Sequence, residues 1–321
     1  MRFSFAWLCF LGATGVAFGQ APSRPETRNA ALRYWQAFAE LKDPPANREI
    51  LVEMEKVLAA EAPWDEPRLG GIVVANEIAL GIMQRATKLP DCDWGVEYSR
   101  GPEASIAFVP RAHVLARLNT LLGIRQMVKG QPQAAVDTWI AGIRFAQDLT
   151  KGGSLLFALT AKSVLAQEMH TLTAEAKQGH LNAEQKKRLY DALSALPEDG
   201  FDWGLAWEMD TVSADAFYAE MQKSKDPAKL FERLFEEPAP KGCVPPSAAQ
   251  LKLYHEYMND VAAALRLPTA ATQQRLVELD SKAKGICEAI RVAIPSAERT
   301  NEARTELITT RRESLNALAA H

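Results

Sequence analysis

Residues 116–149 read ARLNTLLGIRQMVKGQPQAAVDTWIAGIRFAQDL, and this stretch indicates the fold class. Helical signals dominate on both sides of Gly130. We expect one helix from about Pro110 to Lys129 and a second from Pro132 to Thr150. Because the connection between them is short, the two helices are expected to pack antiparallel.

The same helical signals continue outward in both directions. Ser23 with Glu26, and Ser247 with Gln250, have the spacing of a capping box at a helix start. Further helices are expected over about 23–41, 47–60, 67–88, 154–177, 182–196, 202–223, 226–235 and 247–265, and the last two begin at Thr269 and Ser296. Runs of alternating β-branched residues, which would predict strands, are absent. The sequence therefore predicts an all-α fold, an array of about a dozen antiparallel helices.

The hairpin at 116–149 resembles the tetratricopeptide repeat (TPR). The residues that carry the resemblance are Leu122, Gly123, Gly130, Ala135, Trp139 and Ile143. The resemblance implies that small residues let the two helices approach and that an aromatic ring fills the groove between them. Pro132 and Gly142 depart from the usual aromatic and alanine, and no clear second copy is present. A solenoid needs about three repeats, so we expect one TPR-like hairpin within a larger helical array.

Taken whole, the chain also resembles exported bacterial all-helical proteins of unassigned function that carry a CDWG-type loop before such a hairpin. This resemblance implies no activity. Residues 1–19 are expected to be a signal peptide and residues 20–196 an N-terminal helical region. Residues 197–321 are expected to form a C-terminal helical region, and because the loops are short the two regions should pack as one body.

The first residues have the three-part layout of a secretory signal peptide. Arg2 gives a positive start, residues 3–18 are almost wholly apolar, and small residues precede a cleavage site after Gly19 or Ala21. Cys9 lies too early in the apolar run to be a lipid-anchored cysteine. No later segment approaches the ~20 apolar residues that a membrane span needs. We therefore expect a periplasmic or secreted protein with no stable membrane insertion after cleavage.

Export bears on the three cysteines that follow the signal peptide. An oxidising compartment permits one disulfide and one free thiol among Cys92, Cys243 and Cys287. We favour Cys243–Cys287, because the loop that carries Cys243 precedes a hairpin that could return Cys287 to it. The alternative is three buried free cysteines that behave as small apolar residues.

Charge and motifs exclude several classes of function. The formal net charge is −3, so the chain lacks the basic surface that nucleic acids require. The histidines lie on separate predicted elements, and no cysteine pair has zinc-finger spacing, so no metal site is expected. Nucleophile motifs and phosphate-binding glycine-rich loops are absent, so no cofactor is expected and an enzyme is disfavoured.

Two breaks in the helical pattern repeat the letters DWG, at Asp93-Trp94-Gly95 and at Asp202-Trp203-Gly204. In the structural interpretation the Asp caps a turn, the Trp anchors it and the Gly supplies an unusual backbone angle. In the functional interpretation the first loop lines a binding cleft, because aromatic rings beside a carboxylate and a guanidinium suit a sugar or peptide. The candidate ligand-binding residues are Asp93, Trp94, Glu97, Tyr98, Arg100 and Trp203.

Two functions follow from these observations. The first is a non-catalytic scaffold that binds a protein or peptide, as helical arrays with a concave groove do. The alternative is an exported hydrolase or carbohydrate-binding protein that uses the loop from Cys92 to Arg100. A hydrolase would need two carboxylates about 5–10 Å apart, for which Asp93 with Glu97 or Glu208 with Asp210 could serve.

Overall fold

The computed structural model describes residues 27–44, 47–104 and 106–319. Within these ranges the regular structure is helical, apart from one isolated β-bridge between Asn29 and Asp91, so the predicted all-α class is confirmed. No helix within these ranges is long and apolar enough to span a bilayer. The expected signal peptide and the Ser23–Glu26 capping box lie outside the described residues.

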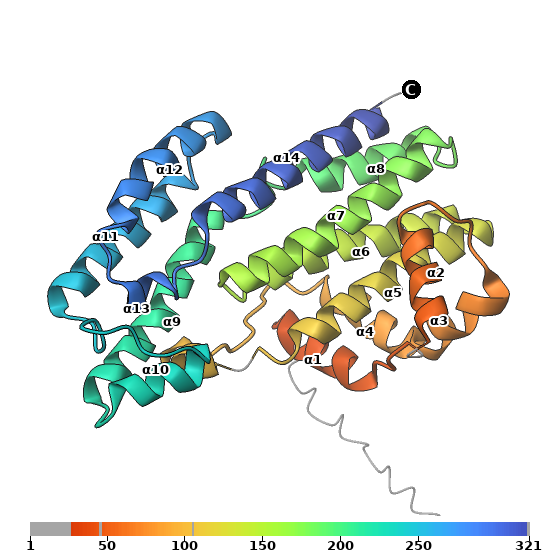
Figure 1. The fold of residues 1–321 in the computed structure, drawn as a ribbon. Coiled ribbons are helices and arrows are strands. Elements are labelled where there is room, and N and C mark those ends of the chain that lie inside the picture. Colours follow the sequence, from red (N-terminus) through yellow and green to blue (C-terminus); the bar gives the residue numbers. More distant parts are fainter. Residues whose placement is uncertain (1–26, 45–46, 105, 320–321) are drawn as a thin grey trace, which may run out of the picture.

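The N-terminal region is built around three long helices that follow one another in the chain. Its elements are α1 (Ala30–Glu40), α2 (Arg48–Leu58), η1 (Glu66–Gly70), α3 (Gly71–Ala75), α4 (Glu77–Ala86), η2 (Tyr98–Glu103), α5 (Val109–Val128), α6 (Pro132–Thr150), α7 (Leu155–Lys177) and α8 (Ala183–Ser194). α5 packs on α6 and α6 on α7, while α1 packs on α4 and α8 on α6. The three long helices run side by side through the middle of Figure 1.

The C-terminal region places a second group of helices beside the first. Its elements are α9 (Trp203–Lys223), α10 (Pro227–Phe235), α11 (Ala248–Ala264), α12 (Thr269–Ala283), α13 (Glu288–Arg291) and α14 (Ala297–Ala319). α9 packs on α11 and on η2, and α11 packs on α12. α14 then returns across the molecule to pack on α7 and α8 as well as on α12, so it joins the two regions (Figure 1).

The α5–α6 hairpin depends on one close approach. Trp139 on α6 is fully buried, and a Cβ atom at Gly123 on α5 would lie only 2.2 Å from the indole Nε1 atom. Any larger residue at position 123 would therefore displace the ring or separate the helices. The contact has the form that the sequence resemblance implies, while membership of the TPR class stays a prediction.

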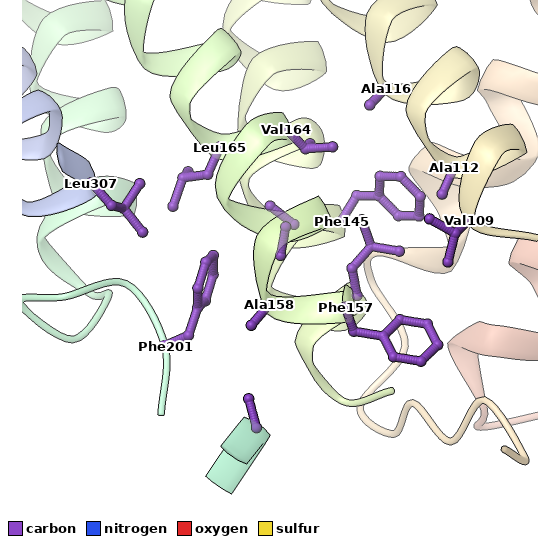
Figure 2. Close-up of a cluster of buried hydrophobic side chains, with 14 of the residues drawn as sticks. Val109, Ala112, Ala116, Phe145, Phe157, Ala158, Val164, Leu165, Phe201 and Leu307 are labelled. Carbon is purple, nitrogen blue, oxygen red and sulfur yellow. The ribbon is translucent and has the colours of Figure 1, made fainter. Parts of the chain in front are cut away.

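One apolar core continues from the hairpin toward the C-terminal helix. Phe145 of α6 and Phe157 of α7 lie beside Val109 of α5, as Figure 2 shows. On the other side of α7, Leu165 faces Phe201 and Leu307 (Figure 2). The core therefore extends across α7 from α5 to α14.

The structure differs from the sequence prediction between residues 67 and 88. A single helix was expected there, but α3 ends before Asn76 and α4 begins after it. The buried Asn76 side chain accepts a hydrogen bond from the Lys42 backbone N–H (2.8 Å) and donates to the Lys42 carbonyl (3.1 Å) and to the Ile72 carbonyl (3.0 Å). At this break Asn76 thus provides hydrogen-bond partners for the Lys42 backbone, just beyond α1. The local sequence does not reveal this contact, because the two residues are far apart in the chain.

Candidate functional site

The first DWG segment forms a turn. The Oδ1 atom of Asp93 accepts a hydrogen bond from the Gly95 backbone N–H at 2.9 Å, and Gly95 has a φ of +64° that favours glycine. The Asp93 backbone exchanges hydrogen bonds with the Asn29 side chain at 2.8 and 2.9 Å. Asp93 therefore fastens the start of α1 to this loop.

Trp94 anchors the same turn in the core. Its indole is only 5% exposed, stacks on Phe108 with ring centroids 4.5 Å apart, and donates to the Asp148 carbonyl at 2.7 Å. The Asp148 carboxylate in turn accepts hydrogen bonds from the Tyr34 hydroxyl and from Lys151, at 2.7 and 2.8 Å. The expectation that Trp94 lines an open cleft is therefore wrong, because its ring and its N–H are both used inside the fold.

The remaining loop residues do not assemble a site around Trp94. Arg100 and Glu97 form an exposed ion pair at 3.8 Å, an arrangement of little energetic consequence. The half-buried Tyr98 hydroxyl donates to the Gly152 carbonyl. The alternative hydrolase or carbohydrate site required these side chains to converge on an open pocket, and the structure does not bring them together.

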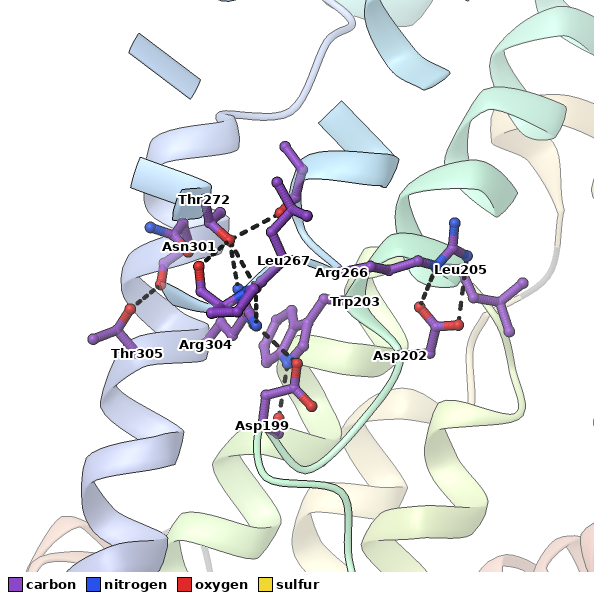
Figure 3. Close-up of polar contacts among 12 residues, drawn as sticks. Asp199, Asp202, Trp203, Leu205, Arg266, Leu267, Thr272, Asn301, Arg304 and Thr305 are labelled. Atoms are coloured by element: carbon purple, nitrogen blue, oxygen red, sulfur yellow. Dashed lines mark hydrogen bonds and ion pairs between the residues drawn. The ribbon is translucent and has the colours of Figure 1, made fainter. Parts of the chain in front are cut away.

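The second DWG segment is also structural. Trp203 is 1% exposed and donates to the Asp199 carbonyl at 2.9 Å, so its expected ligand contact is wrong for the same reason as that of Trp94. Asp202 caps α9 by accepting from the Leu205 backbone N–H at 2.8 Å. Figure 3 shows the polar contacts that surround this turn, among them those of Arg266 with Asp202.

The three cysteines within the described residues divide into one disulfide pair and one free thiol. Cys243 and Cys287 form a disulfide, the pairing that the sequence favours, and Cys92 is free. Burial, together with the nearby Asp148 carboxylate, raises the pKa of Cys92 to about 12. A thiol with so high a pKa is almost wholly protonated at neutral pH, so Cys92 is a poor nucleophile.

A pocket of about 390 Å³ lies where η2, α9, α10, α11 and the segment after α13 meet. Most of its lining is apolar: Pro102, Ala214, Phe217, Leu234, Phe235, Tyr254, Met258, Val292, Ala293 and Pro295. The polar side chains in the lining are Asp210 and Ser213, apart from the Tyr254 phenol. We call this concavity the α9 pocket.

Two local features shape the α9 pocket. Gly101 has a φ of +59°, and a Cβ atom there would lie 3.2 Å from the Phe217 nitrogen and from the Ser213 carbonyl oxygen, so glycine lets the η2 loop rest directly on α9. Cys287 is the N-cap residue of α13, and its disulfide to Cys243 ties α13 to the loop before α11. The loop thus delivers Pro102 to the pocket, and the disulfide holds the wall that follows α13.

Asp210 is the chemically distinctive group of the α9 pocket. The Leu155 backbone N–H, at the start of α7, donates to its Oδ1 atom at a long 3.4 Å. Among the described residues no Lys, Arg or His forms an ion pair with Asp210. Burial raises the pKa of Asp210 to about 7, and the Leu155 hydrogen bond opposes this shift only in part. An uncompensated carboxyl in apolar surroundings is the kind of group that concentrates at functional sites.

Further titratable groups surround Asp210. Burial raises the pKa of both Tyr98 and Tyr254, and the Asp210 charge adds to the shift in each case. These phenols are therefore neutral in the physiological range. His255 on α11 and Asp215 on α9 are hydrogen-bonded to each other at 2.7 Å.

The carboxylate pair Glu208 and Asp210 that the sequence suggested does not act as a pair. Arg266 binds both oxygens of Glu208, at 2.6 and 3.1 Å, whereas Asp210 lines the α9 pocket. The sequence therefore indicated Asp210 as a candidate, but as one half of a carboxylate pair with Glu208 that the structure does not form. A usable signal was present, because Ser213, Ala214 and Phe217 follow Asp210 at helical spacing and place one carboxyl on a largely apolar stripe.

Other concavities exist but lack this combination. One of about 350 Å³ lies between α2, α5 and α7 and includes the hydrogen-bonded pair Glu175 and His180. Another of about 570 Å³ lies between α4, α6 and α8, where Arg188 is already paired with Asp137. Across the described ranges, no group of three or more His, Cys, Asp or Glu residues could hold a metal ion.

Comparisons of the chain with protein-family models, with curated proteins and with solved structures find no match. The function is therefore inferred from the chemistry of the α9 pocket alone.

Proposed function

We propose that the protein is an exported scaffold that binds a peptide segment by seating one large apolar side chain in the α9 pocket. The observation that carries the proposal is the composition of the lining, in which Phe217, Phe235 and Met258 face a space of about 390 Å³. Buried anchors of this kind supply most of the binding free energy in peptide and protein recognition.

The polarity of the pocket favours a peptide over a sugar. A sugar carries several hydroxyl groups, and each one buried without a partner costs about 1–3 kcal/mol. The lining offers Asp210, Ser213 and the Tyr254 hydroxyl as its polar side-chain groups. An apolar side chain needs no such partners, so it fits the lining better than a sugar ring does.

The rim of the pocket suits a peptide backbone that continues into solvent. Arg233 of α10 and Glu103 of η2 form an exposed ion pair at 3.6 Å across the two elements that flank the pocket. Polar rims around apolar centres are the usual anatomy of protein-binding surfaces. Arg233 and Glu103 are the sequence neighbours of the lining residues Leu234 and Pro102, and in this proposal they contact the parts of the peptide outside the pocket.

The disulfide supports the exported location. Structural disulfides persist in oxidising compartments and are rare in the cytosol. The Cys243–Cys287 bridge holds the pocket wall that follows α13, so the site depends on an oxidised environment. Export and peptide binding are thus linked through one structural element in this proposal.

Filling the pocket tests the proposal. Fluorescently labelled random peptides are screened for binding by anisotropy, and the expected binders carry a large aliphatic or aromatic residue. Ala214→Leu places a larger side chain in the α9 pocket and should abolish their binding. The matched control Ala192→Leu alters the groove between α4, α6 and α8 and should leave binding unchanged. Equal binding by both variants, or no selective binding by the wild type, would refute the proposal.

A further inference from the structure

We propose that the α9 pocket recognises the free amino terminus of a peptide whose first residue is large and apolar, with Asp210 as the partner of the α-ammonium group. This inference rests on the proposed function and adds the class of peptide. It follows from the position of one carboxyl relative to the apolar lining.

The Asp210 carboxylate has hydrogen-bonding capacity that the described residues leave largely unused. Only one oxygen, Oδ1, has a hydrogen-bond donor among the described residues, and that donor lies 3.4 Å away. No cation of the described chain pairs with the carboxyl, although other partly buried acids do have partners, such as Glu208 with Arg266. A ligand cation would supply the interaction that the fold does not.

The Asp210 carboxyl and the apolar lining lie close together along α9. Asp210, Ser213, Ala214 and Phe217 lie at helical spacing on the pocket side of the helix. Side chains three or four residues apart on a helix are about 5–6 Å apart at Cβ. The carboxyl thus stands one turn from the apolar wall. In an N-terminal residue the ammonium group and the side chain share one carbon atom, so both fit this span together.

A lysine side chain fits less well. Its ammonium group ends a flexible chain of four methylene groups, which would have to occupy the pocket in place of an apolar anchor. The Phe217, Phe235 and Met258 surfaces would then contact only that thin chain. The amino terminus therefore satisfies the carboxyl and the apolar lining at once.

The experiment compares two labelled tetrapeptides, Phe-Ala-Gly-Ala and its N-acetylated form, by fluorescence anisotropy at pH 7.5. A charge-assisted hydrogen bond should give the free amine about a tenfold preference. Asp210→Asn should bind both peptides equally. The matched control Asp215→Asn removes a carboxylate of the same helix that is paired with His255, and it should retain the preference.

The pH dependence separates an α-amine from a lysine. Affinity for the free peptide should rise as Asp210 ionises, through its pKa of about 7. It should fall again above pH ~8 as an α-amine with a pKa of about 7.7–8.0 loses its proton. An acetylated peptide with an internal lysine should show no such fall until much higher pH. Among the other ionisable side chains on the packed parts of α9 and α11 are His255 and Asp215, which contact each other at 2.7 Å, and the Asp215→Asn control removes that contact. Tyr98 and Tyr254 have raised pKa values and stay neutral.

The outcomes are distinguishable. Equal binding of free and acetylated peptides, blocked by Ala214→Leu, would overturn this inference and leave the proposed function standing. Equal or tighter binding of the acetylated lysine peptide would also overturn it. Absence of binding by every peptide would overturn both.

Discussion

Replacing Arg304 of α14 by methionine should destabilise the protein strongly, because this side chain ties three segments together. Its Nε atom donates to Asp199 at 2.9 Å, its Nη1 atom to the Thr272 hydroxyl at 3.0 Å and its Nη2 atom to the Leu267 carbonyl at 2.8 Å. Figure 3 shows these contacts from α14 to the loop before α9 and to the start of α12.

Burial sets the size of the effect. The Arg304 side chain is 6% exposed and that of Asp199 is 19% exposed, so removal of the guanidinium leaves the Asp199 carboxylate without its ion-pair partner. The Leu267 carbonyl also loses a donor, although it still accepts from the Thr272 hydroxyl at 3.0 Å. Breaking a buried ion pair from one side costs about 3–5 kcal/mol. For a chain of this length the melting temperature should fall by roughly 8 °C. The double variant Arg304→Met with Asp199→Asn should recover part of the loss, because no buried charge is then unpaired.

Urea denaturation followed by circular dichroism measures these free energies of unfolding. Arg312 provides a matched control on the same helix, because its pair with Glu198 is 3.8 Å long and both side chains are more than two-thirds exposed. Arg312→Met should leave stability unchanged within error. This prediction is wrong if Arg304→Met lowers the free energy of unfolding by less than about 1 kcal/mol, or if Arg304→Met and Arg312→Met lower it equally.

Further predictions concern the hairpin, the two buried carboxyls and the disulfide. Gly123→Ala should lower the free energy of unfolding by about 1–3 kcal/mol, because its Cβ atom would meet the Trp139 ring; an unchanged melting temperature would contradict this. The pKa of Asp210, about 7, lies above the ~3.9 of an unfolded aspartate, so the native state binds more protons and wild-type stability should fall between about pH 4 and pH 7. Asp210→Asn should lack that fall and be more stable at pH 8 by up to about 4 kcal/mol, as urea titrations across pH would show. Burial raises the pKa of Glu168 to about 8, so Glu168→Gln should remove a similar loss of stability between about pH 4 and pH 8. Thiol titration of the denatured mature protein, which lacks Cys9, should find one free thiol, and finding three would remove the disulfide.

Local signals predicted most of the helices correctly. Asn182 and Gln185 form a capping box at the start of α8, where a helix was expected from residue 182, and Ser247 caps α11 by accepting from the Gln250 backbone N–H at 3.3 Å. These contacts join residues three apart, so they are visible in the sequence itself. Helix α13 escaped prediction because it has four residues and begins at Cys287, which lacks a strong capping side chain.

The candidate site was less predictable because it depends on contacts between distant segments. The Trp94 indole is buried by its bond to Asp148 and its stack on Phe108, and neither partner is adjacent in sequence. Asp210 faces a pocket whose walls come from α10, α11 and the chain after α13. A carboxyl on an apolar helical stripe was visible, but the absence of a cation partner could be judged only in the folded protein.

The central claim, that peptides bind in the α9 pocket, is tested most directly at Met258. This residue is 1% exposed and lines the pocket, whereas Met83 of α4 is buried in the N-terminal region. Protein labelled with ¹³C at the methionine methyl groups is titrated with the free Phe-Ala-Gly-Ala peptide, and Met258→Leu assigns the signal. The account predicts a saturable shift of the Met258 methyl resonance, with the dissociation constant found by anisotropy and no shift at Met83. Binding that leaves the Met258 resonance in place would contradict it.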